Sequence, residues 1–166
     1  MAKKFTDKEY AEYMLANFVL GYIDTAIFIG ANLFEKYFQK EVDLKKTERF
    51  IEFKVYKSKY FSNEKYWKQD VLHCYKKMEK HEIETEIEKF THLRNDFVHG
   101  LDDNEIINRK NEIRKFILYI YFSFHSACRQ VINEFGEDID LIFEWDGEVI
   151  VDSLKSILPY NFVLEK

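Results

Sequence analysis

MLANFVLGYIDTAIFIGANLF, residues 14–34, is the stretch that decides the fold of this 166-residue chain. It is apolar on nearly every side, and its polar interruptions are Asn17, Asp24 and Asn32. A helix of this kind is either buried in a protein core or inserted in a membrane. A charged residue at a bilayer centre costs about 3 kcal/mol, and no distinct aromatic or basic belt flanks the stretch. We therefore expect the central helix of a bundle and no membrane partner.

Outward from this stretch, the helical pattern extends in both directions. Thr6 or Asp7 is a suitable N-cap, and Glu9 lies in the first turn, where a carboxylate suits the exposed backbone donors. Apolar residues then recur at helical spacing to about residue 39, which predicts one long helix. These residues are Tyr10, Tyr13, Met14, Phe18, Ile23, Ile27, Leu33, Phe34 and Tyr37.

The rest of the chain also reads mainly as helix, because it holds one Pro and five Gly. Residues 44–61 predict a helix or a helix plus a turn. Residues 62–100 predict one long helix or two in tandem, opening at a Ser62 cap and ending at Gly100, a residue type that suits the left-handed helix end. Asp102, Asp103 or Asn104 caps a further helix of about thirty residues that closes at Gly136.

After Gly136 the pattern changes, because Asp146-Gly147 lies between two alternating runs and predicts a two-residue hairpin turn. The expected fold class is therefore all-α, an antiparallel bundle of four to five helices over residues 1–136. Residues 137–166 would add a small C-terminal β-hairpin and a tail to the same domain.

Charge and cysteine content narrow the class of protein. The net charge of −5 argues against a general polyanion binder, but residues 36–80 carry 13 basic and 7 acidic residues. This basic middle region either meets phosphates or is the solvated face of lysine-rich helices. Two cysteines, Cys74 and Cys128, and an N-terminus without a signal-peptide pattern fit a cytoplasmic protein.

No phosphate-binding glycine loop, nucleophile elbow or Cys-x-x-Cys pair is present, so the histidines are the main candidates for chemistry. His92, Asp96 and His99 share one helix face at i, i+4 and i+7, a spacing that can hold a divalent metal or simply form a solvated polar stripe. His73-Cys74 and His125-x-x-Cys128 offer zinc ligands but match no familiar spacing. We expect no metal and no cofactor.

Arg94 and His99 stand five residues apart in RNDFVHG, residues 94–100. On an ideal helix their side chains point about 140° apart, so they meet only if the helix loosens near Gly100 or the Arg side chain bends round. With five Arg and five His in the chain, the spacing alone is a weak signal.

The sequence around the pair strengthens it, because Asn95 follows the arginine, Phe97 and Val98 are expected to be a buried apolar pair, and a helix end follows His99. This motif resembles the signature of the HEPN family, which are all-helical domains of about this size. The resemblance covers the bundle, but its specific part is Arg94, Asn95 and His99. It implies a homodimer whose two motifs meet across the interface and, in many members, a metal-independent endoribonuclease.

The implied chemistry suits these residue types. RNA carries its own nucleophile in the 2′-OH, so the protein needs only to move protons and stabilise the charged phosphate. His99 can take the 2′ proton or protonate the 5′ oxygen, and Arg94 can bind the phosphate oxygens. Asn95 can orient the phosphate or the imidazole, and Asp96 can hold the His tautomer or repel substrate. The expected products are a 2′,3′-cyclic phosphate and a 5′-OH.

Three other features belong to this hypothesis. Asn17, Asp24 and Asn32 form one polar stripe that can face Arg94 or can mark where bundle helices hydrogen-bond. HEPN toxins paired with a nucleotidyltransferase antitoxin usually have Tyr two places after the His, and this chain has Leu101. An antitoxin or another regulatory protein is nevertheless an expected partner of a growth-arresting toxin or phage-defence effector.

Two alternatives stay open. In one, the chain is a catalytically inactive HEPN-like module that binds nucleotide, RNA or a protein partner. In the other, the motif is structural: His99 is a cation favoured at a helix end, and Arg94 pairs with Glu86 or Glu88.

Overall fold

The computed structural model describes residues 4–42 and 52–124, and within these ranges it is an all-α helical bundle with no strand. The helices with ten or more residues are α1 (Asp7–Val19), α2 (Ile23–Glu41), α3 (Phe53–Ser62), α6 (Lys80–Val98) and α8 (Lys110–Phe124). The shorter helices are α4 (Glu64–Trp67), α5 (Val71–Lys76) and α7 (Asp103–Asn108). The expected Asp146-Gly147 hairpin and the boundary at residue 136 lie outside the described residues.

Residues 7–41 form a helical hairpin rather than the single helix that we expected. α1 ends at Val19 because Gly21 adopts a φ of +91°, a left-handed conformation that glycine takes without strain. Asp7 at the start of α1 then pairs with Lys36 and Lys40 near the end of α2, so the two helices run antiparallel. The single polar stripe through Asn17, Asp24 and Asn32 is therefore wrong, because Asn17 lies on a different helix.

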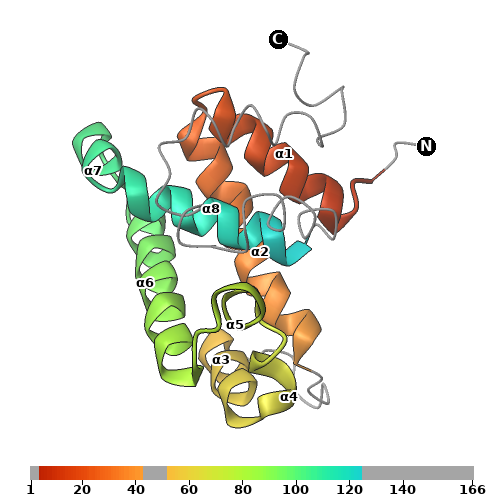
Figure 1. Cartoon of the computed structure of the whole chain (residues 1–166). Coiled ribbons are helices and arrows are strands. Elements are labelled where there is room, and N and C mark those ends of the chain that lie inside the picture. Colours follow the sequence, from red (N-terminus) through yellow and green to blue (C-terminus); the bar gives the residue numbers. More distant parts are fainter. Residues whose placement is uncertain (1–3, 43–51, 125–166) are drawn as a thin grey trace.

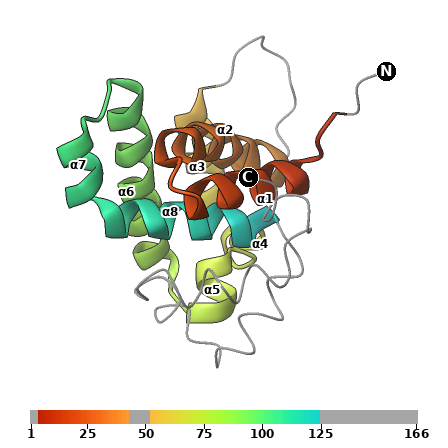
Figure 2. The ribbon, with the colours of Figure 1, turned by 90° about the horizontal axis from the view of Figure 1, so that it is seen from above.

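The centre of the bundle is formed by α1, α2 and α8. α8 passes across α2 in Figure 1 and lies alongside α1 and α2 when seen from above (Figure 2), and the close approach of α8 to α2 depends on Gly30. A methyl group at Gly30 would lie 3.0 Å from a Phe116 ring atom and 3.2 Å from the Met14 sulfur. Met14, Ile27 and Phe34 are fully buried, as their helical spacing predicted. No helix in the described ranges is long and apolar enough to cross a membrane.

The helix boundaries follow local cap chemistry. Thr6 caps α1, and its side chain and that of Glu9 bond to each other's backbone, so this expected helix start is confirmed. The expected Ser62 cap is wrong, because α3 ends at Ser62 and Asn63 caps α4. Asp102 caps α7 as one of the three residues we expected. The continuous helix after it is also wrong, because α7 ends at Asn108 and α8 begins at Lys110.

α6 positions the RNDFVHG motif. It packs against α2, α5 and α8 through an apolar face. In Figure 1 it stands at the edge of the bundle, with α7 above it and α3 and α5 near its lower end. The buried residues of this face are Ile83, Ile87, Phe90, Thr91 and Leu93. The opposite face of α6 is left open to solvent along its length.

Candidate active site

The motif lies where α6 ends, beside the middle of α2. α6 is helical to Val98, His99 is its C-cap, and Gly100 has a φ of +93°. This confirms the helix end expected at Gly100. Asn95 and His99 are four residues apart and therefore lie one above the other on the same side of the helix.

Arg94, Asn95 and His99 line one pocket of about 390 Å³. The α2 side of this pocket is formed by Ala31, Asn32 and Glu35. Val98 completes it and is 73% exposed, so the expectation that Val98 is buried is wrong. The structure therefore brings the three motif residues to one concave surface within a single chain, although an ideal helix would point Arg94 and His99 far apart. The long Arg94 side chain makes this possible, because it turns toward α2 and α3.

Arg94 is held by an aromatic ring and a carboxylate. Its guanidinium carbon lies 4.5 Å from the centre of the Phe53 ring of α3, a cation–π contact. Its Nη1 lies 3.5 Å from Glu35 Oε2, and its Nη2 donates to Asn95 Oδ1 at 3.2 Å. The side chain is 18% exposed, so the guanidinium is fixed at the edge of the pocket rather than extended into water.

One nitrogen of the Arg94 guanidinium, Nη1, makes an ion pair with Glu35 but no hydrogen bond with a described residue. Nη1 is covered from solvent, yet it has no hydrogen-bond partner among the described residues. Its 3.5 Å distance to Glu35 is an ion-pair distance, longer than the 2.7–3.2 Å of a strong N–H···O bond. Nη1 is therefore a buried donor whose partner among the described residues is a long ion pair with Glu35.

Glu35 is the residue of this pocket that the sequence analysis missed. The competing structural interpretation expected Arg94 to pair with Glu86 or Glu88, but Glu86 pairs with Lys89, and Glu88 with Lys57 and His92. Glu35 is about sixty residues away along the chain, on another helix. Glu35 lies one helical turn after Ala31 and Asn32, so the sequence places these three residues on one face of a helix. The sequence does not show that this face packs on α6, and Glu35 could not be predicted as a partner of Arg94 without that contact.

The supporting residues that we predicted lie elsewhere. Asp96 accepts from Arg109 at 2.7 Å, which ties α6 to the start of α8. Asp24 lies in the first turn of α2 and does not line the pocket. It is eleven residues before Glu35, about 16 Å along the helix axis. Neither carboxylate therefore takes part in this pocket.

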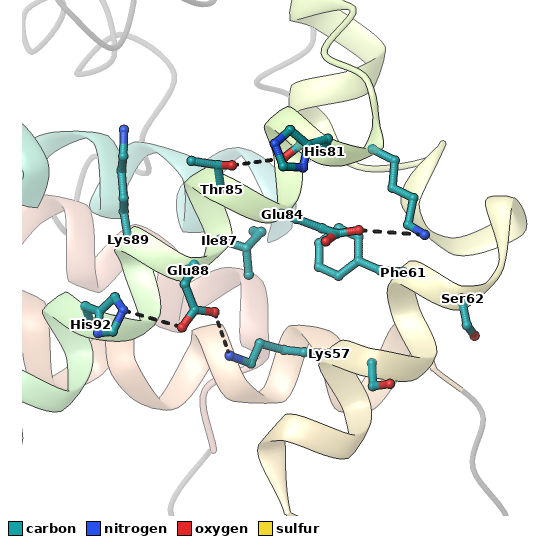
Figure 3. A pocket seen from close by; sticks show the side chains of 12 residues that line it. Lys57, Phe61, Ser62, His81, Glu84, Thr85, Ile87, Glu88, Lys89 and His92 are labelled. Carbon is teal, nitrogen blue, oxygen red and sulfur yellow. Dashed lines mark hydrogen bonds and ion pairs between the residues drawn. The ribbon is translucent and has the colours of Figure 1, made fainter.

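His92 lines a different and larger pocket, of about 730 Å³, between α3 and α6. Figure 3 shows Glu88 between Lys57 and His92, with His81 and Thr85 one to two turns away on α6. Its basic groups are offset by carboxylates, because Lys57 pairs with Glu88 and Lys80 with Glu84. Three lysines, Lys57, Lys80 and Lys89, line this pocket with two glutamates, Glu84 and Glu88, whereas Arg94 and Glu35 offset each other in the smaller pocket.

His92, Asp96 and His99 do not converge. They contact Glu88, Arg109 and the Arg94 pocket respectively. Within residues 4–42 and 52–124, no three His, Cys, Asp or Glu side chains are close enough to hold a metal ion. Of the other histidine-cysteine pair considered for zinc, His125 and Cys128 lie outside the described residues.

Comparisons with protein-family models, with curated proteins and with solved structures gave no match to this chain. The class that the fold defines is thus an all-α helical bundle, and its function must be argued from the pocket itself.

Proposed function

We propose that this chain is a metal-independent endoribonuclease of HEPN type. It would cleave RNA by attack of the 2′-OH on the adjacent phosphate and leave 2′,3′-cyclic phosphate and 5′-OH ends. The observation that carries the proposal is the shared pocket of Arg94, Asn95 and His99, since an arginine can bind the phosphate and a histidine can transfer a proton in this reaction.

The geometry around Arg94 suits a phosphate. A guanidinium stacked on Phe53 is preorganised, so little side-chain entropy is lost when it binds an oxyanion. Arg94 lines the pocket, so a phosphate that enters would lie beside its guanidinium group. His99 lies at the helix end, where its imidazole is exposed to a bound substrate.

The resemblance also implies a homodimer acting in the cytoplasm as a toxin or phage-defence effector, and we include this in the proposal. Its support in the structure is two large exposed apolar side chains, one in the pocket and one on α2. Val98 lines the pocket and is 73% exposed, and Phe28, one turn before Asn32 on α2, is 62% exposed. A second chain bound at this face would cover both side chains.

One observation favours a second candidate function, a module of the same fold that lacks catalysis and binds nucleotide, RNA or a protein partner. Arg94 already has Glu35 as an ion-pair partner and Phe53 as a stacking partner, which is how a structural arginine is held. In that case Arg94→Ala changes affinity or stability, and no cyclic phosphate accumulates.

The test is cleavage of a single-stranded RNA by the purified protein in excess EDTA. We expect the wild type to cut, and Arg94→Ala and His99→Ala each to abolish cutting. His92→Ala is the matched control, because it removes a histidine from the same helix but from the other pocket. Cleavage that persists in both motif variants, or that EDTA abolishes in the wild type, would contradict the proposal.

A further inference from the structure

An RNA strand longer than a dinucleotide extends beyond the Arg94 pocket on at least one side of the phosphate that is cut. We propose that the α3–α6 pocket, which Lys57, Lys80 and Lys89 line, is a second subsite for the same strand. Its ligand is single-stranded RNA, bound through the backbone phosphates next to the one that is cut. This inference rests on the proposed ribonuclease function and adds a substrate-binding surface to it.

The two pockets lie along one side of α6. Thr85 and Glu88 line the α3–α6 pocket, and Asn95 and His99 line the Arg94 pocket. These four residues follow one another at intervals of three, seven and four residues, which keeps their side chains on one side of a helix. The stripe that they form is about 21 Å long. His92 lies between the two pairs, where it contacts Glu88, and we assign it no phosphate. A strand laid along α6 therefore passes from one pocket to the other.

The Phe53 ring of α3 connects the cationic groups of the two pockets. Lys57 Nζ lies 5.2 Å from the centre of this ring, and the guanidinium carbon of Arg94 lies 4.5 Å from it. Because both groups contact the same ring, they lie within about 10 Å of each other. Phosphates that follow one another along a single strand can contact two cations at this separation, as in grooves that track a nucleic-acid backbone.

The lysines of the pocket are paired weakly enough to exchange a carboxylate for a phosphate. Lys57 Nζ lies 3.4 Å from a Glu88 oxygen, and Lys80 Nζ lies 3.7 Å from a Glu84 oxygen. The two glutamate side chains are 57% and 42% exposed, and pairs this exposed contribute about 0–1 kcal/mol each. Lysines also outnumber glutamates by three to two in the lining. A phosphate that enters can therefore displace either carboxylate into water.

Lys57 is already held in place at the wall of the pocket. Its side chain is 16% exposed, and its Nζ donates to Thr91 Oγ1 at 3.3 Å in addition to its contacts with Glu88 and Phe53. Figure 3 shows the side chain reaching from α3 toward Glu88 of α6. A cation that is fixed before binding loses little side-chain entropy when an anion binds it.

This subsite is compatible with a catalytic site that two chains complete. The α6 residues of the α3–α6 pocket lie between Lys80 and His92, whereas the exposed Val98 lies at the other end of the helix. A second chain bound at Val98 would leave the α3–α6 pocket of each chain open. In a two-fold dimer, each chain would then present its own subsite to the strand outside the shared catalytic site.

The first test measures the affinity for a short single-stranded RNA with 2′-O-methyl groups, which cannot be cut, by fluorescence anisotropy. We expect Lys57→Gln and Lys89→Gln each to raise Kd by about fivefold or more. Each should also reduce the slope of log Kd against log salt concentration by about 0.7, the share of one phosphate contact. Lys59→Gln is the matched control, because it removes the same charge from α3 but does not line the pocket. Equal effects of Lys57→Gln and Lys59→Gln would show that only net charge matters and would overturn the inference.

Glu88→Gln tests the same subsite with the opposite sign. If a phosphate displaces Glu88 from Lys57, loss of the carboxylate charge strengthens binding, and we expect Kd to fall by about threefold. Glu82→Gln is the matched control, because Glu82 is exposed on the same helix and does not line the pocket. Unchanged affinity in Glu88→Gln would mean that the Lys57–Glu88 pair is structural, and the inference would be wrong.

The second test separates the subsite from the site of cleavage. A dinucleoside monophosphate has one phosphate and fills only the Arg94 pocket. We expect Lys57→Gln to cut it with wild-type kcat/KM, but to cut a longer RNA with a raised KM and a near wild-type kcat, and Lys57→Arg to restore the KM. Equal losses on both substrates would mean that Lys57 acts through Phe53 and Arg94, and would overturn the inference.

Failure of this inference and failure of the proposed function give different results. An active wild-type enzyme whose RNA affinity does not change in Lys57→Gln and Lys89→Gln would refute the subsite and leave the ribonuclease proposal intact. A wild-type protein that cuts no RNA, but binds it more weakly after the same two substitutions, would refute the ribonuclease proposal and retain the α3–α6 pocket as an RNA-binding surface.

Discussion

Two carboxylates, Asp70 and Glu35, show how differently this fold uses acidic side chains. Asp70 is fully buried, and its Oδ2 accepts from Tyr60 and Tyr119, each at 2.6 Å. Its Oδ1 accepts from the Leu72 backbone at 2.9 Å and so caps α5. Glu35 instead is half exposed in an open pocket and faces one cation at a long distance. Complete hydrogen bonding makes a group structural, and incomplete bonding leaves it available to a ligand.

Asp70 and three tyrosines, Tyr37, Tyr60 and Tyr119, form one buried hydrogen-bond network. Tyr37 Oη lies 3.2 Å from Tyr60 Oη, so the network links α2, α3, α5 and α8. Burial raises the pKa of the Tyr37, Tyr60 and Tyr119 hydroxyls, and the Asp70 charge raises them further. These hydroxyls therefore stay protonated, so that Tyr60 and Tyr119 can donate their hydrogen bonds to the buried Asp70 oxygen.

The largest predicted effect is the loss of RNA cleavage on substitution of Arg94. Arg94→Lys keeps the charge but loses the planar fork and the stacking on Phe53. We expect RNA cleavage to fall by about 100- to 1,000-fold, equivalent to about 3–4 kcal/mol, with a melting temperature within a few degrees of wild type. Kinetic assays and thermal unfolding of the same preparations check both values, and a lysine variant with near wild-type kcat would contradict a bidentate role for Arg94.

The second prediction concerns stability and tests the hydrogen bonds that Tyr60 and Tyr119 donate to Asp70. Asp70→Ala removes the α5 cap and leaves two buried tyrosine hydroxyls without their acceptor. We expect the free energy of unfolding to fall by about 3 kcal/mol, measured by urea unfolding at mildly acidic pH. Cleavage by the folded fraction should not change, because Asp70 does not line the pocket. A loss below about 1 kcal/mol would mean that the network does not hold the helices together.

The third prediction concerns the pH dependence of stability. Burial raises the pKa of the Asp70 carboxyl, and the hydrogen bonds from Tyr119 and Tyr60 offset this only in part. The folded protein then keeps the proton to a higher pH than the unfolded chain. The free energy of unfolding therefore falls as pH rises from the unfolded pKa through the folded pKa.

Asp70→Asn has no group that titrates at this position, so it isolates that contribution. We expect the stability of Asp70→Asn relative to wild type to increase with pH across the same window. Urea unfolding at a series of pH values measures the difference, and a difference that is constant with pH would show that Asp70 does not titrate on folding.

The smallest effect belongs to a third carboxylate, Asp7, which pairs with Lys36 and Lys40. Burial by itself raises the Asp7 pKa, but the hydrogen bonds and charges of the two lysines outweigh it, and the net shift is downward. We expect Asp7→Asn to cost about 1 kcal/mol at neutral pH, and the difference from wild type to vanish as pH falls through the folded pKa. Stability curves that remain apart at low pH would contradict this assignment.

Features set by neighbouring residues were the ones that the sequence predicted well. The Thr6–Glu9 capping box, the helix end at Gly100 and the Asp102 cap need only a few consecutive residues. The apolar spacing of α2 correctly placed Ile27, Leu33 and Phe34 in the core. Tyr10 and Tyr13 fit the same spacing but are exposed, since periodicity does not say how wide the buried face is.

Features that depend on packing were missed. The sequence predicted one helix across Gly21, because a single glycine inside an apolar periodic stretch is compatible with a helix until two halves can pack together. Glu35 and Phe53 were not predicted as partners of Arg94, since they lie on two other helices far away in sequence. The Asp70 cluster was missed for the same reason, because its tyrosines come from three different helices.

The most direct test of the central claim uses the substrate rather than the protein. An oligodeoxynucleotide that contains a single ribonucleotide is incubated with wild-type protein in EDTA, next to the same oligonucleotide made entirely of DNA. We predict cleavage only on the 3′ side of the ribonucleotide, with a 2′,3′-cyclic phosphate on one product and a 5′-OH on the other. Cleavage of the all-DNA strand, or cleavage at the ribonucleotide that appears only when a divalent metal is added, would contradict the claim.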